Sequence, residues 1–349
     1  MRIIITGGCG FIGSALIRFI LDNTENEVIN IDKMTYAANP INLSNYENHK
    51  NYSFLNNDIC DSHEVKRVFN EYKPNGIIHL AAESHVDRSI DSPAEFINTN
   101  IFGTFTLLNT AREFHLNHPS DFKLFHHVST DEVYGDLGVS NDFFREDTPY
   151  DPHSPYSSSK ASSDHLVRAW NRTYGLPTVI TNCSNNYGPY QSPEKLIPMM
   201  IMNAINKKEL PVYGNGMQVR DWLYVDDHVK AIYTVFMSQK TNQTFNIGGG
   251  EQKTNLDVVN TICHYLDKNI SDKPDQIKSF SQLIRFVEDR PGHDEKYAID
   301  YSKISRELNW KPSESFDSGI QKTISWYIDN MEQYQPNIDI ITKRRGLNR

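Results

Sequence analysis

The segment RIIITGGCGFIG, residues 2–13, decides how this chain folds. Residues 2–6 are mostly apolar and β-branched, as in a buried strand, and apolar residues then recur at a helical spacing through residue 21. Between the two lies a glycine run. Glycine triplets are common in loops, but one that follows a strand and opens a helix offers backbone amides and a helix dipole to a pyrophosphate. The segment therefore predicts a dinucleotide-binding loop formed by Gly7, Gly10, Phe11, Ile12 and Gly13.

The same alternation of strand and helix continues through the first third of the chain. Short apolar runs at residues 27–31, 52–55, 76–80 and 123–128 predict strands, and residues 62–72 and about 94–114 predict helices. Strands and helices that alternate at this pace form βαβ units around a parallel sheet. We expect an α/β fold, a Rossmann-like doubly wound parallel sheet, with ligands at the carboxyl ends of its strands.

The second half predicts a smaller α/β domain interleaved with the first. Residues 157–174 and 178–183 continue the pattern as a helix and a strand, but from residue 185 prolines and glycines separate shorter elements. A helix at 226–237 and a strand at 244–247 return to the first domain, and the glycines at 248–250 end that strand. We predict a dinucleotide domain of residues 1–184 plus about 221–250, a substrate domain of about 185–220 plus 251–335, and a mobile tail at 336–349.

Composition excludes several classes of protein. The 349 residues carry 35 Lys and Arg against 44 Asp and Glu, a net charge of −9, which argues against a nucleic-acid-binding surface. No apolar run is long enough for a membrane span, and the start lacks the pattern of a signal peptide. The four cysteines are far apart, and the thirteen histidines show no metal-binding spacing, so we expect no disulfide, no metal and a cytoplasmic setting.

An acidic residue after the second strand indicates which dinucleotide is bound. Asp32 lies 19 residues after Gly13, where a carboxylate accepts hydrogen bonds from the adenosine ribose and repels a 2′-phosphate. This favours NAD over NADP. Asp58 and Ile59, after the third strand, are further candidates beside the adenine, although Asp58 alone would more often be a loop or cap residue.

Tyr156 and Lys160 form the second motif. Four residues apart on a helix, they share one face, and a nearby ammonium lowers the pKa of a phenol towards the working pH. Alone, this spacing usually reflects packing or surface chemistry. Together with the glycine loop it indicates a catalytic base.

These motifs resemble the extended short-chain dehydrogenase/reductase family. The string STDEVYG at residues 129–135 resembles, more narrowly, the signature of the nucleoside-diphosphate-glucose 4,6-dehydratases. The resemblance extends over almost the whole chain, through DKMTYA at 32–37, LAAESHVDRS at 80–89, NCSNNYGP at 182–189, PEKLIP at 193–198, RDWLYV at 220–225 and DRPGH at 289–293.

The resemblance implies NAD-dependent dehydration of a nucleoside-diphosphate glucose, with dTDP-glucose expected and UDP-glucose left open. Tyr156 is then the base for oxidation at C4, Lys160 holds its pKa down and contacts the nicotinamide ribose, and Thr130 hydrogen-bonds the C4 oxygen. Glu132 removes the C5 proton and Asp131 is the acid at C6. Because neighbours in a strand face opposite ways, Asp131 and Glu132 must lie beyond the strand's end. Without these flanking matches, an Asp-Glu pair there would be read as a loop or cap feature.

The resemblance also assigns binding residues. Some cofactor positions are already named: the glycine loop, Asp32, Asp58 and Ile59. The resemblance adds Lys33, Met34, Thr35, Leu80, Ala81, Ala82, Glu83, Ser84, Thr99, Tyr156, Lys160 and Asn186. Arg220, then Arg290, are expected at the substrate pyrophosphate and Lys195 nearer the sugar. The remaining substrate positions are Ser84, Thr130, Asn185, Leu196, Pro211, Val212, Tyr213, Asn255, Asp289, Pro291, Gly292 and His293.

The resemblance further implies a homodimer formed through the helices at about 94–114 and 157–174. Two other readings remain. A sugar-nucleotide 4-epimerase or decarboxylase would share the glycine loop with Tyr156 and Lys160, but would not need the Asp131-Glu132 pair. A non-catalytic NAD-sensing protein would need none of these catalytic residues.

Overall fold

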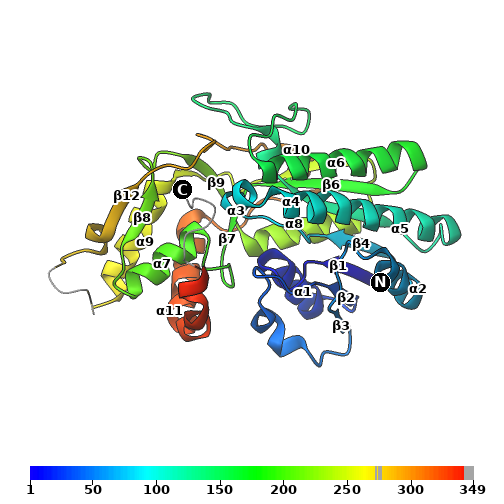
Figure 1. Ribbon diagram of the computed structural model, residues 1–349, viewed down its shortest axis with the longest axis horizontal. Helices are drawn as coiled ribbons and strands as arrows, with labels where there is room; N and C mark the ends of the chain where they lie inside the picture. Colours follow the sequence, from blue (N-terminus) through cyan, green and yellow to red (C-terminus); the bar gives the residue numbers. More distant parts are fainter. Residues whose placement is uncertain (272, 274–276, 342–349) are drawn as a thin grey trace.

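The computed structural model describes residues 1–271, 273 and 277–341, which fold into two lobes (Figure 1). The larger lobe contains a seven-stranded parallel sheet in the order β10-β6-β5-β4-β1-β2-β3. This confirms the predicted fold class. The strands are β1 (Arg2–Thr6), β2 (Glu27–Ile31), β3 (Tyr52–Leu55), β4 (Gly76–His79), β5 (Leu124–Thr130), β6 (Thr178–Cys183) and β10 (Gln243–Ile247).

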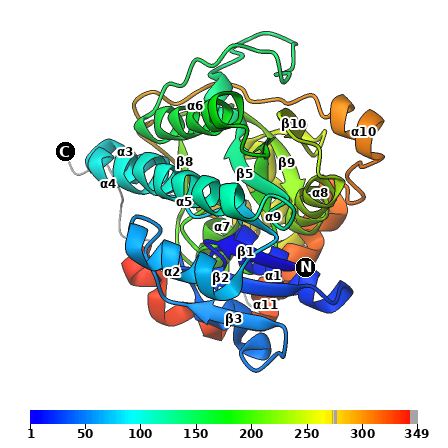
Figure 2. The same ribbon diagram turned by 90° about the vertical axis from the view of Figure 1, so that its right-hand side faces the viewer.

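Alternate residues of β1 explain why helices cover both faces of this sheet. Ile3 and Ile5 pack in one apolar cluster with α1 and α8, whereas Ile4 packs in another with α2, α5 and α6, because successive side chains in a strand face opposite ways. Figure 2 shows α5 and α6 on one side of the sheet and α8 on the other. The helices are α1 (Phe11–Asn23), α2 (Ser62–Tyr72), α5 (Thr104–Asn117), α6 (Pro155–Tyr174), α8 (Val225–Ser238) and α10 (Ser302–Leu308).

The smaller lobe has its own apolar core between α7, α9 and α11. A three-stranded sheet and a two-stranded sheet line it, in the orders β11-β9-β7 and β12-β8. Its elements are α7 (Leu196–Ile205), α9 (Asn255–Asn269), α11 (Phe316–Ile341), β7 (Asn185–Tyr187), β8 (Leu210–Tyr213), β9 (Val219–Tyr224), β11 (Gln252–Thr254), β12 (Ile284–Val287) and the short helix η4 (Phe280–Leu283).

The predicted helix at 94–114 is a series of helical segments. Two of them, α4 (Pro93–Phe96) and the wide-turned η2 (Ile97–Gly103), precede α5, and the short helix α3 (Val86–Asp91) lies before the predicted range. In η2 the carbonyl oxygen of Asn100 accepts the hydroxyls of both Thr104, at 2.5 Å, and Ser163 of α6, at 2.7 Å. These two hydroxyls compete for the Asn100 carbonyl with the backbone amide that would bind it in a regular α-helix. The spacing of apolar residues in the sequence could not reveal this competition.

Two further boundaries differ from those predicted. Residues 221–224 belong to β9, which pairs with β7 and β11 rather than with the large sheet, so the chain returns to the larger lobe at α8. Residues 336–341 of the predicted tail form the last part of helix α11. Residues 342–349 of that tail lie outside the described part of the chain. Residues 302–308, predicted within the substrate domain, form α10, which packs against β10 and α8 of the larger lobe. The division into two domains otherwise stays a prediction. No helix among the described residues is long and apolar enough to cross a membrane.

The topology brings a ligand site to one edge of the sheet. The strand order reverses between β1 and β4, so the connections after these two strands diverge to opposite faces and leave a crevice at their carboxyl ends. The 3₁₀ turns η1 (Pro40–Tyr46) and η3 (Asp131–Tyr134) follow β2 and β5 at this edge.

Candidate active site

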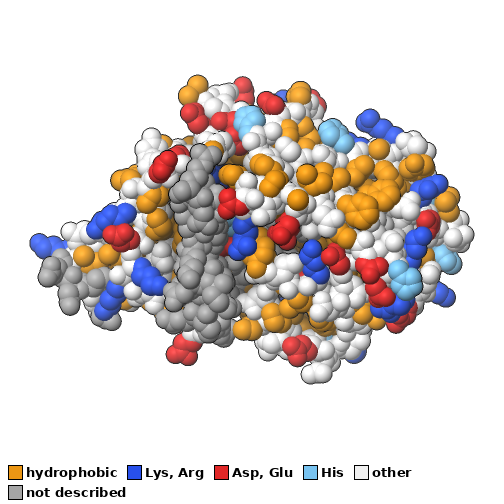
Figure 3. All heavy atoms as spheres, viewed as in Figure 1, with side chains coloured by type: hydrophobic (Ala, Val, Ile, Leu, Met, Phe, Trp, Pro, Cys, Tyr) orange, Lys and Arg blue, Asp and Glu red, His pale blue; other side chains and the backbone are white. Residues whose placement is uncertain are grey.

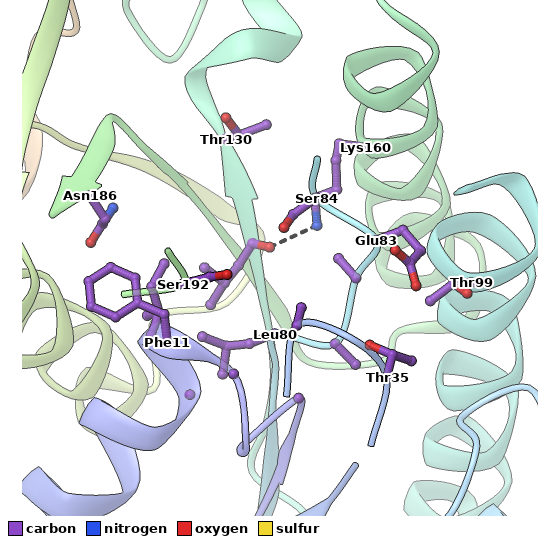
Figure 4. Close-up of a pocket in the computed structure, with 18 of the residues that line it drawn as sticks. Phe11, Thr35, Leu80, Glu83, Ser84, Thr99, Thr130, Lys160, Asn186 and Ser192 are labelled. Atoms are coloured by element: carbon purple, nitrogen blue, oxygen red, sulfur yellow. Dashed lines mark hydrogen bonds between the residues drawn. The ribbon is translucent and has the colours of Figure 1, made fainter. Parts of the chain in front are cut away.

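A pocket lies at the carboxyl ends of the strands, between the two lobes (Figure 4). It brings together most of the residues predicted for cofactor and catalysis. The predicted residues that line it are Gly7, Gly10, Phe11, Ile12, Gly13, Asp32, Lys33, Thr35, Ile59, Leu80, Ala81, Ala82, Glu83, Ser84, Thr99, Thr130, Asp131, Glu132, Tyr156, Lys160, Asn185, Asn186 and Lys195.

The glycine loop is packed too tightly for side chains. Gly7 has φ +72°, and a Cβ there would lie 2.7 Å from the Cα of Ala81. A Cβ on Gly13 would lie 2.2 Å from the carbonyl oxygen of Gly7. Helix α1 begins after Gly10 with no side-chain cap and no acidic residue in its first turn, so its amides face the pocket unopposed by carboxylates. This end of the helix fits a pyrophosphate.

Asp32 extends this site towards the ribose of a dinucleotide. Its Oδ2 accepts the amide of Cys9 at 2.9 Å and its Oδ1 accepts the amide of Met34 at 2.8 Å. Burial raises the pKa of Asp32, and the two amides and Lys33 oppose that rise. Met34 and Asp58 do not line the pocket; Asp58 lies 3.5 Å from the ammonium of Lys33.

The predicted end of the strand before Asp131 is confirmed. Strand β5 ends at Thr130, and η3 carries Asp131 and Glu132 round a tight turn. The Thr130 hydroxyl accepts the Glu132 amide at 3.3 Å and donates to Asp131 Oδ1 at 3.3 Å. This cap explains how adjacent carboxylates reach one pocket, because a regular strand would point them to opposite faces.

Asp131 and Glu132 have different electrostatic surroundings. Burial, followed by the charges of Glu132 and Asp221, raises the pKa of Asp131 well above its usual value. Burial also raises the pKa of Glu132, but three nearby cations oppose it: Arg290, Arg220 and Lys195. Among the described residues, the buried Oδ2 of Asp131 has no hydrogen-bond partner. Asp131 is therefore suited to hold a proton, and Glu132 to lose one.

Tyr156 and Lys160 face the pocket from the first two turns of α6. Pro155 and a reciprocal Ser154–Ser157 capping box begin this helix. The Lys160 ammonium donates to the carbonyl oxygen of Val128 at 2.9 Å (Figure 4). We predicted a lowered pKa for Tyr156, but burial and then the charge of Glu132 raise it well above its usual value. Burial of the phenol outweighs the attraction expected from the ammonium.

The other predicted substrate residues lie outside this pocket, on the smaller lobe. Arg290 Nη1 lies 3.2 Å from Asp87 Oδ1, and the Tyr213 hydroxyl lies 3.4 Å from the same carboxylate. Arg220 donates to the carbonyl oxygen of Asp294 at 2.9 Å. The predicted substrate residues that do not line the pocket are Leu196, Pro211, Val212, Tyr213, Arg220, Asn255, Asp289, Arg290, Pro291, Gly292 and His293.

The pocket also has lining residues that the sequence interpretation missed: Ile31, Ala37, Ala38, Asn57, Val128, Ser129, Cys183, Ser184, Gln191, Ser192 and Glu194. Several of these lie at or just after the carboxyl end of a strand, and the rule for parallel sheets could have found them. Residues 191–194 carry no such signal. Within the part of the chain described here, no group of three or more His, Cys, Asp or Glu could hold a metal ion.

Comparison with known proteins places the chain in a family. Residues 4–323 match the family described as GDP-mannose 4,6 dehydratase. The chain is 58% identical over 350 residues to a dTDP-glucose 4,6-dehydratase of Escherichia coli, covering 97% of both chains.

Two solved structures share the fold across nearly the full length. A dTDP-glucose 4,6-dehydratase of Bacillus anthracis in complex with NAD is 42% identical with a TM-score of 0.85, covering 96% of this chain and 99% of that one. A dTDP-glucose 4,6-dehydratase of Streptomyces venezuelae with NAD bound is 40% identical with a TM-score of 0.87 and the same coverage.

The tight glycine loop leads to a graded prediction. Gly13→Ala should weaken NAD binding by about a hundredfold or more, because the new methyl group would displace the backbone of the phosphate loop. Gly10→Ala should bind far more tightly than Gly13→Ala, since among the described residues, apart from its chain neighbours, its Cβ would meet within 4 Å just the Gly7 carbonyl oxygen, at 3.3 Å. Titration calorimetry with NAD measures both. Equal affinities would contradict this account of the loop.

Proposed function

The chain belongs to the GDP-mannose 4,6 dehydratase family, and from that premise we propose that it catalyses NAD-dependent dehydration of dTDP-glucose to dTDP-4-keto-6-deoxyglucose. The observation that carries this proposal is the capped Thr130-Asp131-Glu132 turn facing Tyr156 and Lys160 in one pocket. An epimerase or decarboxylase would not need the adjacent acid and base, so those alternatives are not favoured.

Residues of the larger lobe hold the cofactor. The glycine loop and the first turn of α1 bind the pyrophosphate, and Asp32 binds the adenosine ribose. A 2′-phosphate would meet the Asp32 carboxylate, so NAD is bound rather than NADP. When bound, NAD accepts a hydride from C4 of the sugar and returns it to C6, so it is regenerated in each turnover.

Tyr156 and Thr130 act at C4. Tyr156 takes the proton of the C4 hydroxyl as the C4 hydrogen leaves as a hydride, which produces a 4-ketone. Thr130 hydrogen-bonds the C4 oxygen, and Lys160 contributes the positive charge that favours the phenolate of Tyr156.

Glu132 and Asp131 then remove water across C5 and C6. The 4-ketone acidifies the hydrogen on C5, and Glu132 takes it as a proton. Asp131 donates its proton to the C6 hydroxyl, which leaves as water. C6 then receives the hydride and C5 a proton, which gives the 4-keto-6-deoxy sugar. The different surroundings of the two carboxyl groups support this division into acid and base.

The cations of the smaller lobe hold the substrate. Arg220 and Arg290 bind its pyrophosphate, and Lys195 lies near the sugar, where its ammonium also donates to the carbonyl oxygen of Ser84 at 3.3 Å. The charges of all three cations act to lower the pKa of Glu132. The same side chains that would bind the substrate therefore also influence the carboxylate that would act at C5.

Incubation with dTDP-glucose and NAD should give a 4-keto product with strong absorbance in alkali. Thymine and uracil differ by one methyl group, worth about 1–3 kcal/mol in a pocket, so UDP-glucose should have a kcat/KM about 10–200-fold lower. The specificity constants of the two nucleotides measure this. The absence of product from dTDP-, UDP- and CDP-glucose would exclude the proposed function.

Glu132→Gln should separate oxidation from dehydration. Loss of the C5 base should slow product formation by about 10²–10⁴-fold, while the absorbance of NADH accumulates because C4 is still oxidised. Stopped-flow absorbance and product assays follow the two steps. Glu25→Gln is the control, since the Glu25 side chain is 90% exposed on the surface. Full turnover by Glu132→Gln would show that the role assigned to Glu132 is wrong.

We further propose a cytoplasmic homodimer. The four cysteines are free, as suits a reducing compartment. Ile97, Phe102 and Phe105, from η2 and α5, are 56%, 50% and 38% exposed, and Figure 3 shows apolar side chains gathered over this region. Phe105 also packs edge-on against Trp170 of α6, so one apolar surface spans both helices.

Phe102→Glu should therefore shift the chain from dimer to monomer by placing a charge in that apolar surface. Light scattering coupled to size-exclusion chromatography measures the mass. Val139→Glu is the matched control, because Val139 is 97% exposed on a different segment and its change should leave the mass unaltered. A dimer that persists in Phe102→Glu would place the interface elsewhere.

A further inference from the structure

We propose that Asp164 is a positioning residue for the dehydration reaction: it anchors the carboxyl end of β5, from which Thr130, Asp131 and Glu132 project, and balances the positive charge of Lys160. This inference rests on the proposed function. Asp164 does not line the pocket and would not touch substrate or cofactor.

Asp164 is a fully buried carboxylate held from several elements. It lies one helical turn after Lys160 on α6 and has no exposed surface. Its Oδ2 accepts the hydroxyl of Tyr150 at 2.7 Å and the hydroxyl of Ser129 at 3.0 Å. Its Oδ1 lies 3.2 Å from Nε2 of His127 on β5. A carboxylate surrounded in this way is ordered by its partners rather than by water.

These contacts lead directly to the catalytic turn. Ser129 is the residue before Thr130 and itself lines the pocket. On the neighbouring strand β6, the side-chain amide of Asn182 donates to the carbonyl oxygen of Thr130 at 3.0 Å and lies 3.5 Å from Asp164 Oδ2. Asp164 thus holds the last residues of β5 through Ser129 and supports Asn182, which holds Thr130. The position of Asp131 and Glu132 depends on where this strand ends.

The charge of Asp164 requires a counterion. A buried carboxylate is costly unless cations or donors compensate it. His127 does not supply the charge, since burial lowers its pKa to about 4 and leaves it neutral near pH 7. Tyr150 and Tyr134, from the segments beside α6, are neutral phenols whose pKa values burial raises. Two cations of α6 lie near this carboxylate: Arg168, whose guanidinium donates to the Tyr150 hydroxyl at 2.7 Å, and Lys160, whose charge helps to lower the pKa of Asp164.

Lys160 needs Asp164 for the same reason. Burial lowers the pKa of the Lys160 ammonium, and Asp164 is the larger of the two charges that oppose this effect; the other is Cys183. The thiol of Cys183 is itself neutral, since burial raises its pKa to about 12. His79 and His127 also lie close enough to feel the charge of Lys160, and burial lowers the pKa of each, so both are neutral. Asp164 is therefore the anion that keeps Lys160 protonated.

Asp164→Asn tests this role, since it keeps the size of the side chain and removes its charge. Without that charge Lys160 loses its proton at lower pH, so the alkaline limb of the kcat/KM profile should move down by about one pH unit or more. The pH dependence of NAD affinity should move in the same direction. NAD affinity requires no sugar turnover, so it still tests the inference if dTDP-glucose proves not to be the substrate.

Two controls separate charge from structure. Ser129→Ala removes one donor to Asp164 without changing its charge, so kcat should fall while the alkaline limb stays in place. Asp164→Glu keeps the charge in altered geometry and should likewise leave the limb in place with a lower kcat, which keeps the test decisive if Asp164→Asn does not fold. The proposal would be overturned if the kcat/KM pH profile of Asp164→Asn superimposed on that of the wild type. It would also be overturned if the alkaline limb of that profile moved in Asp164→Glu.

Discussion

The close approach of the β1–α1 loop to the end of β4 is the constraint on which the site depends. Gly7 leaves less than 3 Å between the position of a Cβ and the backbone of Ala81, and Gly13 packs against the Gly7 carbonyl oxygen just as closely. This approach is available only to glycine, and it brings the first turn of α1 to the crevice where the strand order reverses. The pocket that begins at this helix end extends along the carboxyl ends of the strands to Thr130, Asp131 and Glu132.

Charge at the site is set locally, against the overall balance of the chain. The net charge of −9 would repel an anionic ligand, yet both proposed ligands are anions. The chain resolves this with a helix N-terminus in the larger lobe and with Lys195, Arg220 and Arg290 from the smaller lobe. Net charge therefore argues against extended polyanions, while a small anion responds to the few groups within its own reach.

Burial also gives chemically similar groups different properties. Asp131 and Glu132 are neighbours in sequence, but Asp131 lies deeper and faces Asp221, whereas Glu132 faces three cations. Burial disfavours the charged forms of both Tyr156 and Lys160. It therefore raises the pKa of the Tyr156 phenol and lowers the pKa of the Lys160 ammonium. Neighbouring charges then decide how much of that shift remains.

The sequence by itself determined the parallel α/β fold and most of the cofactor loop, because periodicity and glycine spacing act over a few residues. It also indicated that β5 must end before Asp131, since adjacent strand residues diverge. The tertiary structure alone decided the wide turns of η2, the placement of residues 221–224 in the second sheet, the raised pKa of Tyr156 and the partners of Asp164. These depend on contacts between segments tens of residues apart, where burial and hydrogen bonding are set by packing that no local pattern records.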